Sequence, residues 1–186
     1  MGITIAVILI AFPFWRSPAS AWQFIAGFAT VLAGVSLRFW AIRQIGGSAR
    51  KTSRLKAVRL INWGPFSLVR NPIYIANATI YAGFSILSGL LWMFPVVLVA
   101  YWFWYDAVVR REEAFLGTTF PAEYPEYLLT TGRWIPKLHF RNRPADVPPY
   151  PFLRILRRER GLVIGVSAGT SIVLLFRWLL SQWLLF

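Results

Sequence analysis

Five runs of apolar residues, separated by shorter polar segments, dominate the pattern of the chain. The runs cover residues 3–15, 21–41, 73–87, 90–109 and 162–186. Apolar residues follow one another in these runs instead of alternating, and a helix needs about 20 of them to cross a bilayer. The pattern therefore predicts an all-α, polytopic membrane bundle of about five transmembrane helices, of which the first is short.

A secretory signal is the alternative for the first run, because Ala19-Ser20-Ala21 resembles a signal-peptidase site. No positive residue precedes the run, however, and Pro13 and Arg16 interrupt the region before that site. A signal peptide combines a positive start with an unbroken apolar core. We therefore expect the first run to be retained as a helix.

Basic residues are concentrated between the apolar runs. The chain has 20 Lys and Arg against 7 Asp and Glu, a formal charge of +13, and the turn at residues 85–89 carries no charge. Positive residues flank membrane spans on the cytoplasmic side. We therefore expect a multi-pass protein with its N-terminus in the cytoplasm and its C-terminus outside, and with affinity for anionic membrane lipids instead of nucleic acid.

The composition excludes several chemistries. The chain has no cysteine, its only histidine is His139, and it contains neither a P-loop nor a GxGxxG motif. Thiolate chemistry, a Ser-His-Asp triad and a His-rich metal site are therefore excluded, and we expect no metal site. An enzyme with this sequence would have to use arginine, glutamate, tyrosine, amide groups and the backbone.

The third run opens with polar residues, in the sequence LVRNPIY. Pro72 suits the first turn of a helix, and Asn71 suits the N-cap position before it. Helix initiation leaves Arg70 and Tyr74 unexplained. Because the turn at Ser88-Gly89 is short, the third and fourth runs form a hairpin, and these residues face the end of the fourth run.

Acidic residues gather at that end of the fourth run. Asp106, Glu112 and Glu113 are the first three acids of the chain. One interpretation is an interfacial cap with ordinary salt bridges, since Asp106 and Arg110 are one turn apart. The hairpin offers a second interpretation, in which the carboxylates complete a site.

The remainder of the chain predicts cytoplasmic segments and a last span. Phe120-Pro121 and Tyr124-Pro125 are expected to break the helix that extends the fourth run. Residues 153–160, LRILRRER, are either a basic amphipathic piece at the lipid surface or the flank of the last span. We divide the chain into a membrane domain at 1–140, with its core at about 30–137, a basic Pro-rich connector at 141–160 and a C-terminal transmembrane helix at 161–186.

These motifs resemble a known family. Gly64-Pro65-Phe66, Arg70-Asn71-Pro72 and Tyr74, followed by a hairpin and Glu112-Glu113, are similar to the signature GPYxxxRHPxYxG and Glu-Glu pair of the isoprenylcysteine carboxyl methyltransferases and phospholipid methyltransferases. The tail with Glu123-Tyr124 and Tyr127 also fits. The chain departs from the family pattern at Asn71 (histidine), Ala76 (glycine), Phe66 (tyrosine) and Val108 (arginine).

The resemblance implies S-adenosyl-L-methionine as the methyl donor and a cofactor pocket at the cytoplasmic face. By the same resemblance, the cofactor-binding residues would be Leu60, Ile61, Phe66, Asn71, Pro72, Tyr74 and Glu112.

The acceptor would be a lipid-like or prenylated small molecule that enters from the membrane, and carboxylate O-methylation is the favoured reaction. Arg70 and Arg111 are candidates to orient its carboxylate. For an amine acceptor, Glu113 or Asp106 would remove the proton. We therefore take Arg70, Arg111 and Glu113 as the candidate catalytic residues.

Two other hypotheses remain open at this point. A membrane reductase of the sterol-reductase type has a similar Arg-His-Pro and Tyr pattern but uses NADPH, and the basic loop at residues 50–59 could hold its 2′-phosphate. A non-catalytic protein that has kept the scaffold would explain Asn71 and Val108. The short chain and the Glu-Glu pair favour the methyltransferase.

Overall fold

The computed structural model describes residues 20–45 and 59–183 of the 186-residue chain. The predicted helix at residues 3–15 and most of the basic loop lie outside the described residues. Within the described residues, every regular element is a helix, as predicted. The helices are α2 (Ala21–Ile45), α3 (Pro65–Leu68), α4 (Pro72–Leu87), α5 (Met93–Thr119), α6 (Tyr124–Thr130), α7 (Phe152–Arg158) and α8 (Arg160–Trp183).

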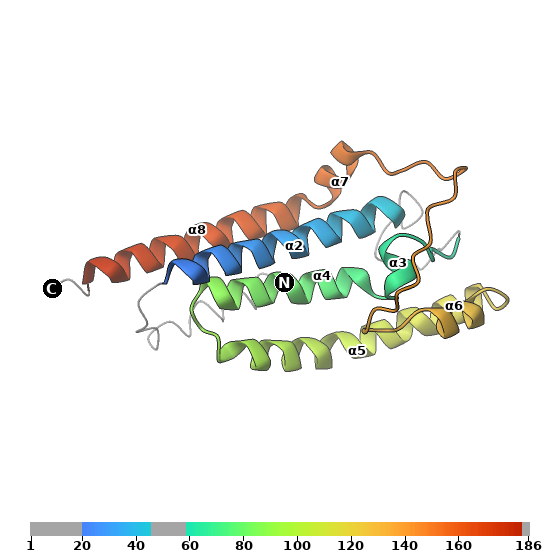
Figure 1. Ribbon diagram of the computed structural model, residues 1–186, viewed down its shortest axis with the longest axis horizontal. Coiled ribbons are helices and arrows are strands. Elements are labelled where there is room, and N and C mark those ends of the chain that lie inside the picture. Colours follow the sequence, from blue (N-terminus) through green and yellow to red (C-terminus); the bar gives the residue numbers. More distant parts are fainter. Residues whose placement is uncertain (1–19, 46–58, 184–186) are drawn as a thin grey trace.

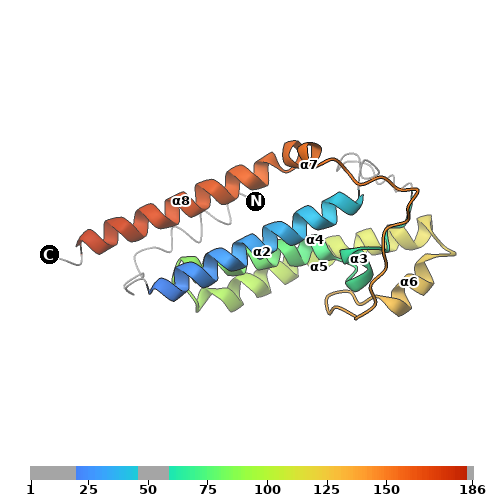
Figure 2. The ribbon, with the colours of Figure 1, turned by 45° about the horizontal axis from the view of Figure 1, so that its top comes forward.

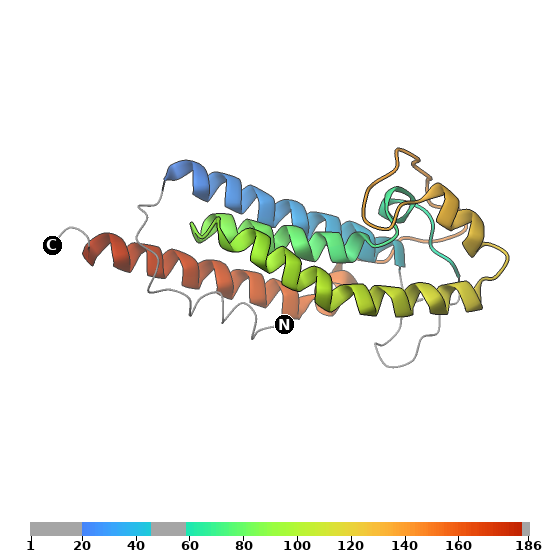
Figure 3. The ribbon, with the colours of Figure 1, turned by 90° about the horizontal axis from the view of Figure 1, so that it is seen from below.

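The four long helices lie lengthwise beside one another (Figure 1). A view turned by 45° shows α8 along one side of α2 and the α4–α5 hairpin along the other (Figure 2). The short helices α3 and α6 lie at the end where α4 begins and α5 ends (Figures 1 and 3), while α7 lies at the beginning of α8, beside α2 (Figures 1 and 2). Helices α2, α4, α5 and α8 correspond to the last four predicted runs, and α5 continues well past residue 109.

Helices α2 and α4 come close together at glycines. A Cβ atom added at Gly83 would lie 2.6 Å from Cγ2 and 2.7 Å from the backbone nitrogen of Val31. One added at Gly34 would lie 2.7 Å from Cγ1 of Ile80. Small residues let two helices in a membrane bring their backbones into van der Waals contact. This contact fixes α4, which carries the residues described below.

Gly83→Ala is expected to lower the melting temperature in detergent. The added methyl group cannot fit without moving the Val31 backbone, and overpacking of this kind destabilises by about 1–3 kcal/mol. Gly165→Ala is the matched control, because a Cβ atom there meets no described atom within 4 Å. Alanine is favoured over glycine in a helix by up to about 1 kcal/mol, so the control should be as stable as wild type or more stable. Equal melting temperatures for the two variants would contradict the close approach.

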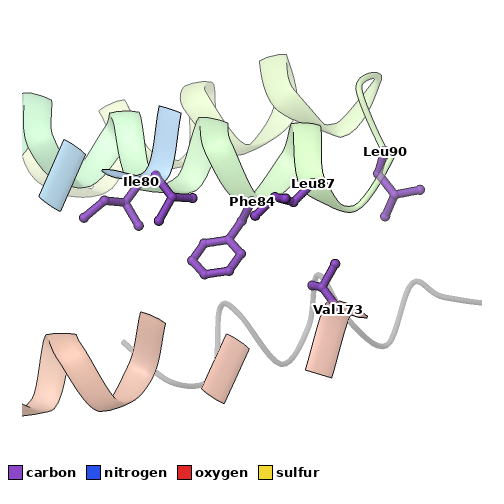
Figure 4. Close-up of a cluster of buried hydrophobic side chains, with 6 residues drawn as sticks. Ile80, Phe84, Leu87, Leu90 and Val173 are labelled. Carbon is purple, nitrogen blue, oxygen red and sulfur yellow. The ribbon is translucent and has the colours of Figure 1, made fainter. Parts of the chain in front are cut away.

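A cluster of buried apolar side chains joins α8 to α2 and α4 (Figure 4). Val173 of α8 lies opposite Phe84 and Leu87 of α4 in this cluster. The complete cluster is Val31, Ile80, Phe84, Leu87, Leu90 and Val173. The C-terminal helix is therefore packed against α4 and α2.

The outer surface of the long helices is apolar. Helices α2 and α8 are each long and apolar enough to cross a membrane, yet only 28% and 17% of their most apolar stretches are buried. Helix α4 is a shorter apolar helix. On α5, Phe103 and Trp104 are 69% and 75% exposed. A large exposed apolar surface is unfavourable in water, so the bundle is suited to lipid.

The turn between α4 and α5 is tight, as predicted. Gly89 has φ 76°, in the left-handed region that favours glycine. The amides of Ser88 and Gly89 donate to the carbonyls of Phe84 and Ile86. The hairpin brings the beginning of α4 beside the end of α5.

The segment after α5 matches the prediction in part. Helix α5 ends at Thr119, directly before Phe120-Pro121, as expected. Pro125 does not break a helix, however, because it lies in the first turn of α6. A proline there lacks an N–H that would be unpaired in any case, so Tyr124-Pro125 begins a helix.

The segment between α6 and α7 contains no helix and runs back along α3. The amide of Gly64 donates to the carbonyl of Arg141 at 2.8 Å, and the amide of Arg141 donates to Oγ of Ser67 at 3.0 Å. Most of residues 153–160 lie in a helix, α7, with Ile155 buried and Phe152 exposed, and this is compatible with both interpretations of that stretch.

Candidate active site at the start of α4

Pro72 and Asn71 occupy the predicted positions at the beginning of α4, but only Pro72 has the predicted role. Pro72 lies in the first turn and Asn71 occupies the N-cap position, as predicted, but the Asn71 side chain makes no capping hydrogen bond. Its Nδ2 instead donates to Oε1 of Glu113 and to the carbonyl of Arg133, both at 3.3 Å. The amide of Asn71 therefore connects α4 to α5 and to the segment after α6.

Glu113 is the centre of this connection. Arg133 donates from Nε at 3.0 Å and from Nη2 at 2.5 Å to Oε2 of Glu113, and Nε of Arg70 lies 3.4 Å from Oε1. The side chains of Arg70 and Glu113 are 13% and 11% exposed. The hydrogen bonding of Arg133 to Glu113 is the main reason that the pKa of Arg133 is raised. One carboxylate thus holds two guanidinium groups in a largely buried place.

Glu112 has a different environment, although it is the next residue. Its carboxylate interacts with the Tyr74 hydroxyl, which lies close to it. Burial raises the pKa of Glu112, and the neighbouring Tyr74 hydroxyl opposes that shift. The Tyr74 ring packs against Tyr105 with a centroid separation of 5.2 Å, and the Tyr101 hydroxyl donates to the Tyr74 carbonyl at 2.9 Å. Tyr74 is therefore held by α5 at its ring and its backbone.

The structure brings together six of the ten residues singled out from the sequence. They are Arg70, Asn71, Pro72, Tyr74, Glu112 and Glu113. Arg111 is exposed on α5. Ile61 is half-buried beside Leu60 in the chain.

Leu60 and Phe66 lie against the tail motif. Leu60 is buried in a cluster with Tyr124 and Tyr127. The Tyr127 hydroxyl donates to the carbonyl of Phe66 at 2.7 Å, so Phe66 is held through its backbone. The segment before α4 and the segment after α5 therefore support each other.

The site contains two further side chains, Arg133 and Tyr124, which the sequence pattern did not assign to it. Arg133 follows α6 with no helical or motif spacing to mark it. Tyr124 belonged to the tail motif, but only the fold shows that Glu113, Arg70 and Arg133 act electrostatically on its hydroxyl. Burial raises the pKa of Tyr124 to about 12.

Several buried polar atoms at this end of the bundle are unsatisfied. Among the described residues, Nε of Arg70, Nε1 of Trp63 and the Tyr124 hydroxyl have no hydrogen-bond partner. Buried polar groups are normally paired, and leaving one unpaired costs about 1–3 kcal/mol. Arg70 and Tyr124 lie near the carboxylate of Glu113, and Glu112, with its half-buried carboxylate, is the adjacent residue of α5. A polar ligand with anionic and cationic groups would satisfy donors and carboxylates of this kind.

Fold and site together define a helical membrane protein with a largely buried polar cluster at one end of its bundle. The family model described as phospholipid methyltransferase matches residues 22–123, more than half of the chain. The chain belongs to the phospholipid methyltransferase family. This confirms the resemblance recognised in the sequence and indicates a membrane enzyme of the methyltransferase type.

Two curated relatives carry names that concern metal resistance. The cobalt-zinc-cadmium resistance protein CzcN of Cupriavidus metallidurans is 33% identical over 111 residues, which is 58% of this chain and 48% of that protein. The nickel-cobalt-cadmium resistance protein NccN of Alcaligenes xylosoxydans xylosoxydans is 27% identical over 141 residues, 73% of this chain and 62% of that protein. The matched regions thus span about half to three fifths of these relatives. No solved structure matches the chain.

Proposed function

We propose that the protein transfers a methyl group from S-adenosylmethionine to the polar end of an amphipathic or lipid-like acceptor. The single observation that supports this most strongly is the meeting of two motif halves, in which Arg70 and Asn71 before α4 contact the carboxylate of Glu113 on α5. Both halves lie inside the segment that matches the family.

The residues present fit S-adenosylmethionine. Glu112 would receive its ammonium group, because a buried carboxylate interacts favourably with a cation. Asn71 and the unsatisfied donors of Arg70 and Tyr124 would face its carboxylate or its nucleobase. When bound, the cofactor supplies a methyl group already activated by the positive sulfonium. The protein has to orient the two reactants and exclude water, which can contribute several kcal/mol.

The contacts of Glu113 favour an acceptor that needs no base. Its Oε2 is occupied by Arg133, and its Oε1 faces Asn71 and Arg70. A carboxylate engaged in this way is suited to holding the site together. O-methylation of an acceptor carboxylate requires no proton removal, because the nucleophile is already ionised. Arg111, which is exposed near the site, would orient that carboxylate.

The proposal includes a topology. Five spans would cross the bilayer, with the N-terminus and the site at the cytoplasmic face and the C-terminus outside. The excess of basic residues in the two long connecting segments supports this orientation. The exposed apolar surfaces of α2, α5 and α8 support contact with lipid along the bundle.

The names of the relatives suggest metal tolerance as the physiological setting. Cobalt, zinc, nickel and cadmium are bound mainly by thiolate and imidazole ligands. This chain has no cysteine and one histidine, and no three Asp, Glu or His side chains of the described part gather as a metal site would require. We therefore propose that any part in metal tolerance comes from a methylated membrane component.

Purified protein in liposomes is expected to transfer labelled methyl groups from S-adenosylmethionine to material that extracts into organic solvent. If the acceptor is a carboxylate, alkali should release the label as methanol, because it cleaves a methyl ester. Label that survives alkali would exclude a methyl ester and hence a carboxylate acceptor. Arg111→Ala should reduce turnover several-fold with unchanged cofactor affinity, whereas Arg110→Ala, which removes the exposed pair with Asp106, should not. The absence of any methyl transfer would contradict the proposal.

A further inference from the structure

The C-terminal helices meet the rest of the bundle through a buried ion pair. Glu159 lies between α7 and α8 and is 7% exposed. Nε of Arg38, on α2, donates to its Oε2 at 2.8 Å. A buried charge that loses its partner is strongly destabilising, so Arg38 and Glu159 are expected to stay paired. Arg38 lies inside the segment that matches the family, and Glu159 lies outside it.

Arg38 also makes a second contact, which points toward the candidate site. Its Nη1 donates to Oδ1 of Asn77 at 2.6 Å, and Asn77 is 6% exposed. The Asn77 side chain also interacts with the Tyr101 hydroxyl, which lies close to it. Asn77 thus lies between Arg38 and Tyr101.

Tyr101 completes the connection. Its hydroxyl donates to the carbonyl of Tyr74, and the Tyr74 hydroxyl interacts with Glu112. A series of polar interactions therefore connects Glu159 to Tyr74 through Arg38, Asn77 and Tyr101. Polar groups in apolar surroundings have few alternative partners, so each contact in such a network restricts the next one.

We propose that Glu159 is a positioning residue, which sets the place of Tyr74, and through it Glu112, by fixing Arg38 and Asn77. The inference rests on the proposed function, because Glu112 binds the cofactor only under that proposal. It gives the C-terminal helices a part in the site, although they follow the family-like segment in sequence. Without Glu159, Arg38 would be free to turn away from Asn77, and the Asn77 amide would lose the partner that orients it toward Tyr101.

The other end of α8 offers a matched comparison. Arg177 is 7% exposed and its Nη1 donates to the carbonyl of Leu87 at 2.5 Å, while Nη2 donates to Oε1 of Gln23 at 3.2 Å. Its guanidinium also lies 4.6 Å from the centroid of the Phe24 ring. Arg177 therefore attaches α8 to the ends of α4 and α2 that lie away from the site. Loss of either arginine contact would loosen α8, but only the Glu159 contact leads to Tyr74.

Hydrogen exchange on full-length protein in detergent, without ligand, tests the inference. The amides of Tyr74 and Ile75 both donate to the Asn71 carbonyl in the first turn of α4. Glu159→Ala should speed their exchange about tenfold, and Glu159→Gln, which keeps the shape and one acceptor, should have a smaller effect. Arg177→Met should lower the melting temperature without changing exchange at these two amides.

Unchanged exchange in Glu159→Ala, or an equal increase in Arg177→Met, would overturn the inference. The same proteins titrated with S-adenosylhomocysteine report separately on the proposed function. If wild type binds the ligand, Glu159→Ala should bind it several-fold more weakly, and Arg177→Met should bind it as wild type does. If wild type binds no S-adenosylhomocysteine, the proposed function fails, and the exchange experiment still decides whether Glu159 positions Tyr74.

Discussion

Glu112→Ala is expected to weaken the binding of S-adenosylhomocysteine about 10- to 100-fold while the protein remains folded. A charge-assisted hydrogen bond contributes about 1.5–3 kcal/mol, and the variant loses the carboxylate that would receive the ligand's ammonium group. Isothermal titration of the purified variant in detergent measures the change. Unaltered affinity would remove Glu112 from the proposed cofactor site.

The difference in stability between Glu112→Gln and wild type should change with pH in a definite direction. Burial raises the pKa of Glu112, so the folded protein holds this proton more tightly than the unfolded chain does. Wild type therefore loses stability as the pH rises from the ordinary pKa of the carboxyl group through the raised one. Glu112→Gln keeps the shape of the side chain and lacks this loss. Its melting temperature relative to wild type should rise over that interval, and a constant difference would contradict burial of the carboxylate.

Glu113→Ala is expected to lose much of its stability, in contrast to Glu112→Ala, which is expected to remain folded. The substitution leaves Arg70 and Arg133 as neighbouring cations with no carboxylate between them. Removing one member of a buried charge cluster costs about 3–5 kcal/mol, and the lower end applies here because the Arg133 side chain is 33% exposed. Thermal unfolding in detergent measures it.

Two further substitutions separate charge from simple loss of a side chain. Glu126→Ala removes an exposed acid of α6 and should leave the melting temperature nearly unchanged. Combining Glu113→Ala with Arg133→Met removes one of the two unpaired cations and should recover part of the lost stability. If the double variant is less stable than Glu113→Ala, the ion pairs are not the cause. Glu113→Gln, which can still accept hydrogen bonds, tests the catalytic role: an amine acceptor would lose turnover in a folded protein, and a carboxylate acceptor would not.

The local features of the fold could be predicted from the sequence because they depend on neighbouring residues. A continuous apolar run defines a helix wherever it lies, and the short polar turn at Gly89 allows only a hairpin. Pro72 begins α4 for a reason that is local to its own backbone. Pro125 shows the limit of this reasoning, since the same proline that ends one helix can begin another, and only the position of α6 decides between them.

The candidate site was predictable only in its outline. The hairpin brings the start of α4 to the end of α5, so the meeting of Tyr74 with Glu112 follows from topology. The partners of Asn71 do not, because a side chain suited to capping can be drawn away by a carboxylate and a carbonyl from distant segments. Arg133 lies 20 residues from Glu113 in sequence, no single helix contains both residues, and no periodic pattern relates the two.

The contacts of the C-terminal helices could not be predicted from the sequence pattern for the same reason. Arg38 and Glu159 are 121 residues apart, and Arg177 lies 90 residues from Leu87. From the pattern alone, Arg177 is an isolated charge in an apolar run and α8 is an anchor. The packing shows that both of these arginines face the bundle, as charged groups in a membrane helix usually do.

S-adenosylmethionine is proposed to bind between the start of α4 and the end of α5. The most direct measurement is a titration of the purified wild-type protein in detergent with S-adenosylhomocysteine and, separately, with NADPH, followed by calorimetry and by thermal unfolding. We predict saturable binding of S-adenosylhomocysteine with a stabilisation of about 2.7 kcal/mol at a ligand concentration of 100 times Kd, and neither effect with NADPH. Binding of NADPH instead, or of neither ligand, would contradict the account.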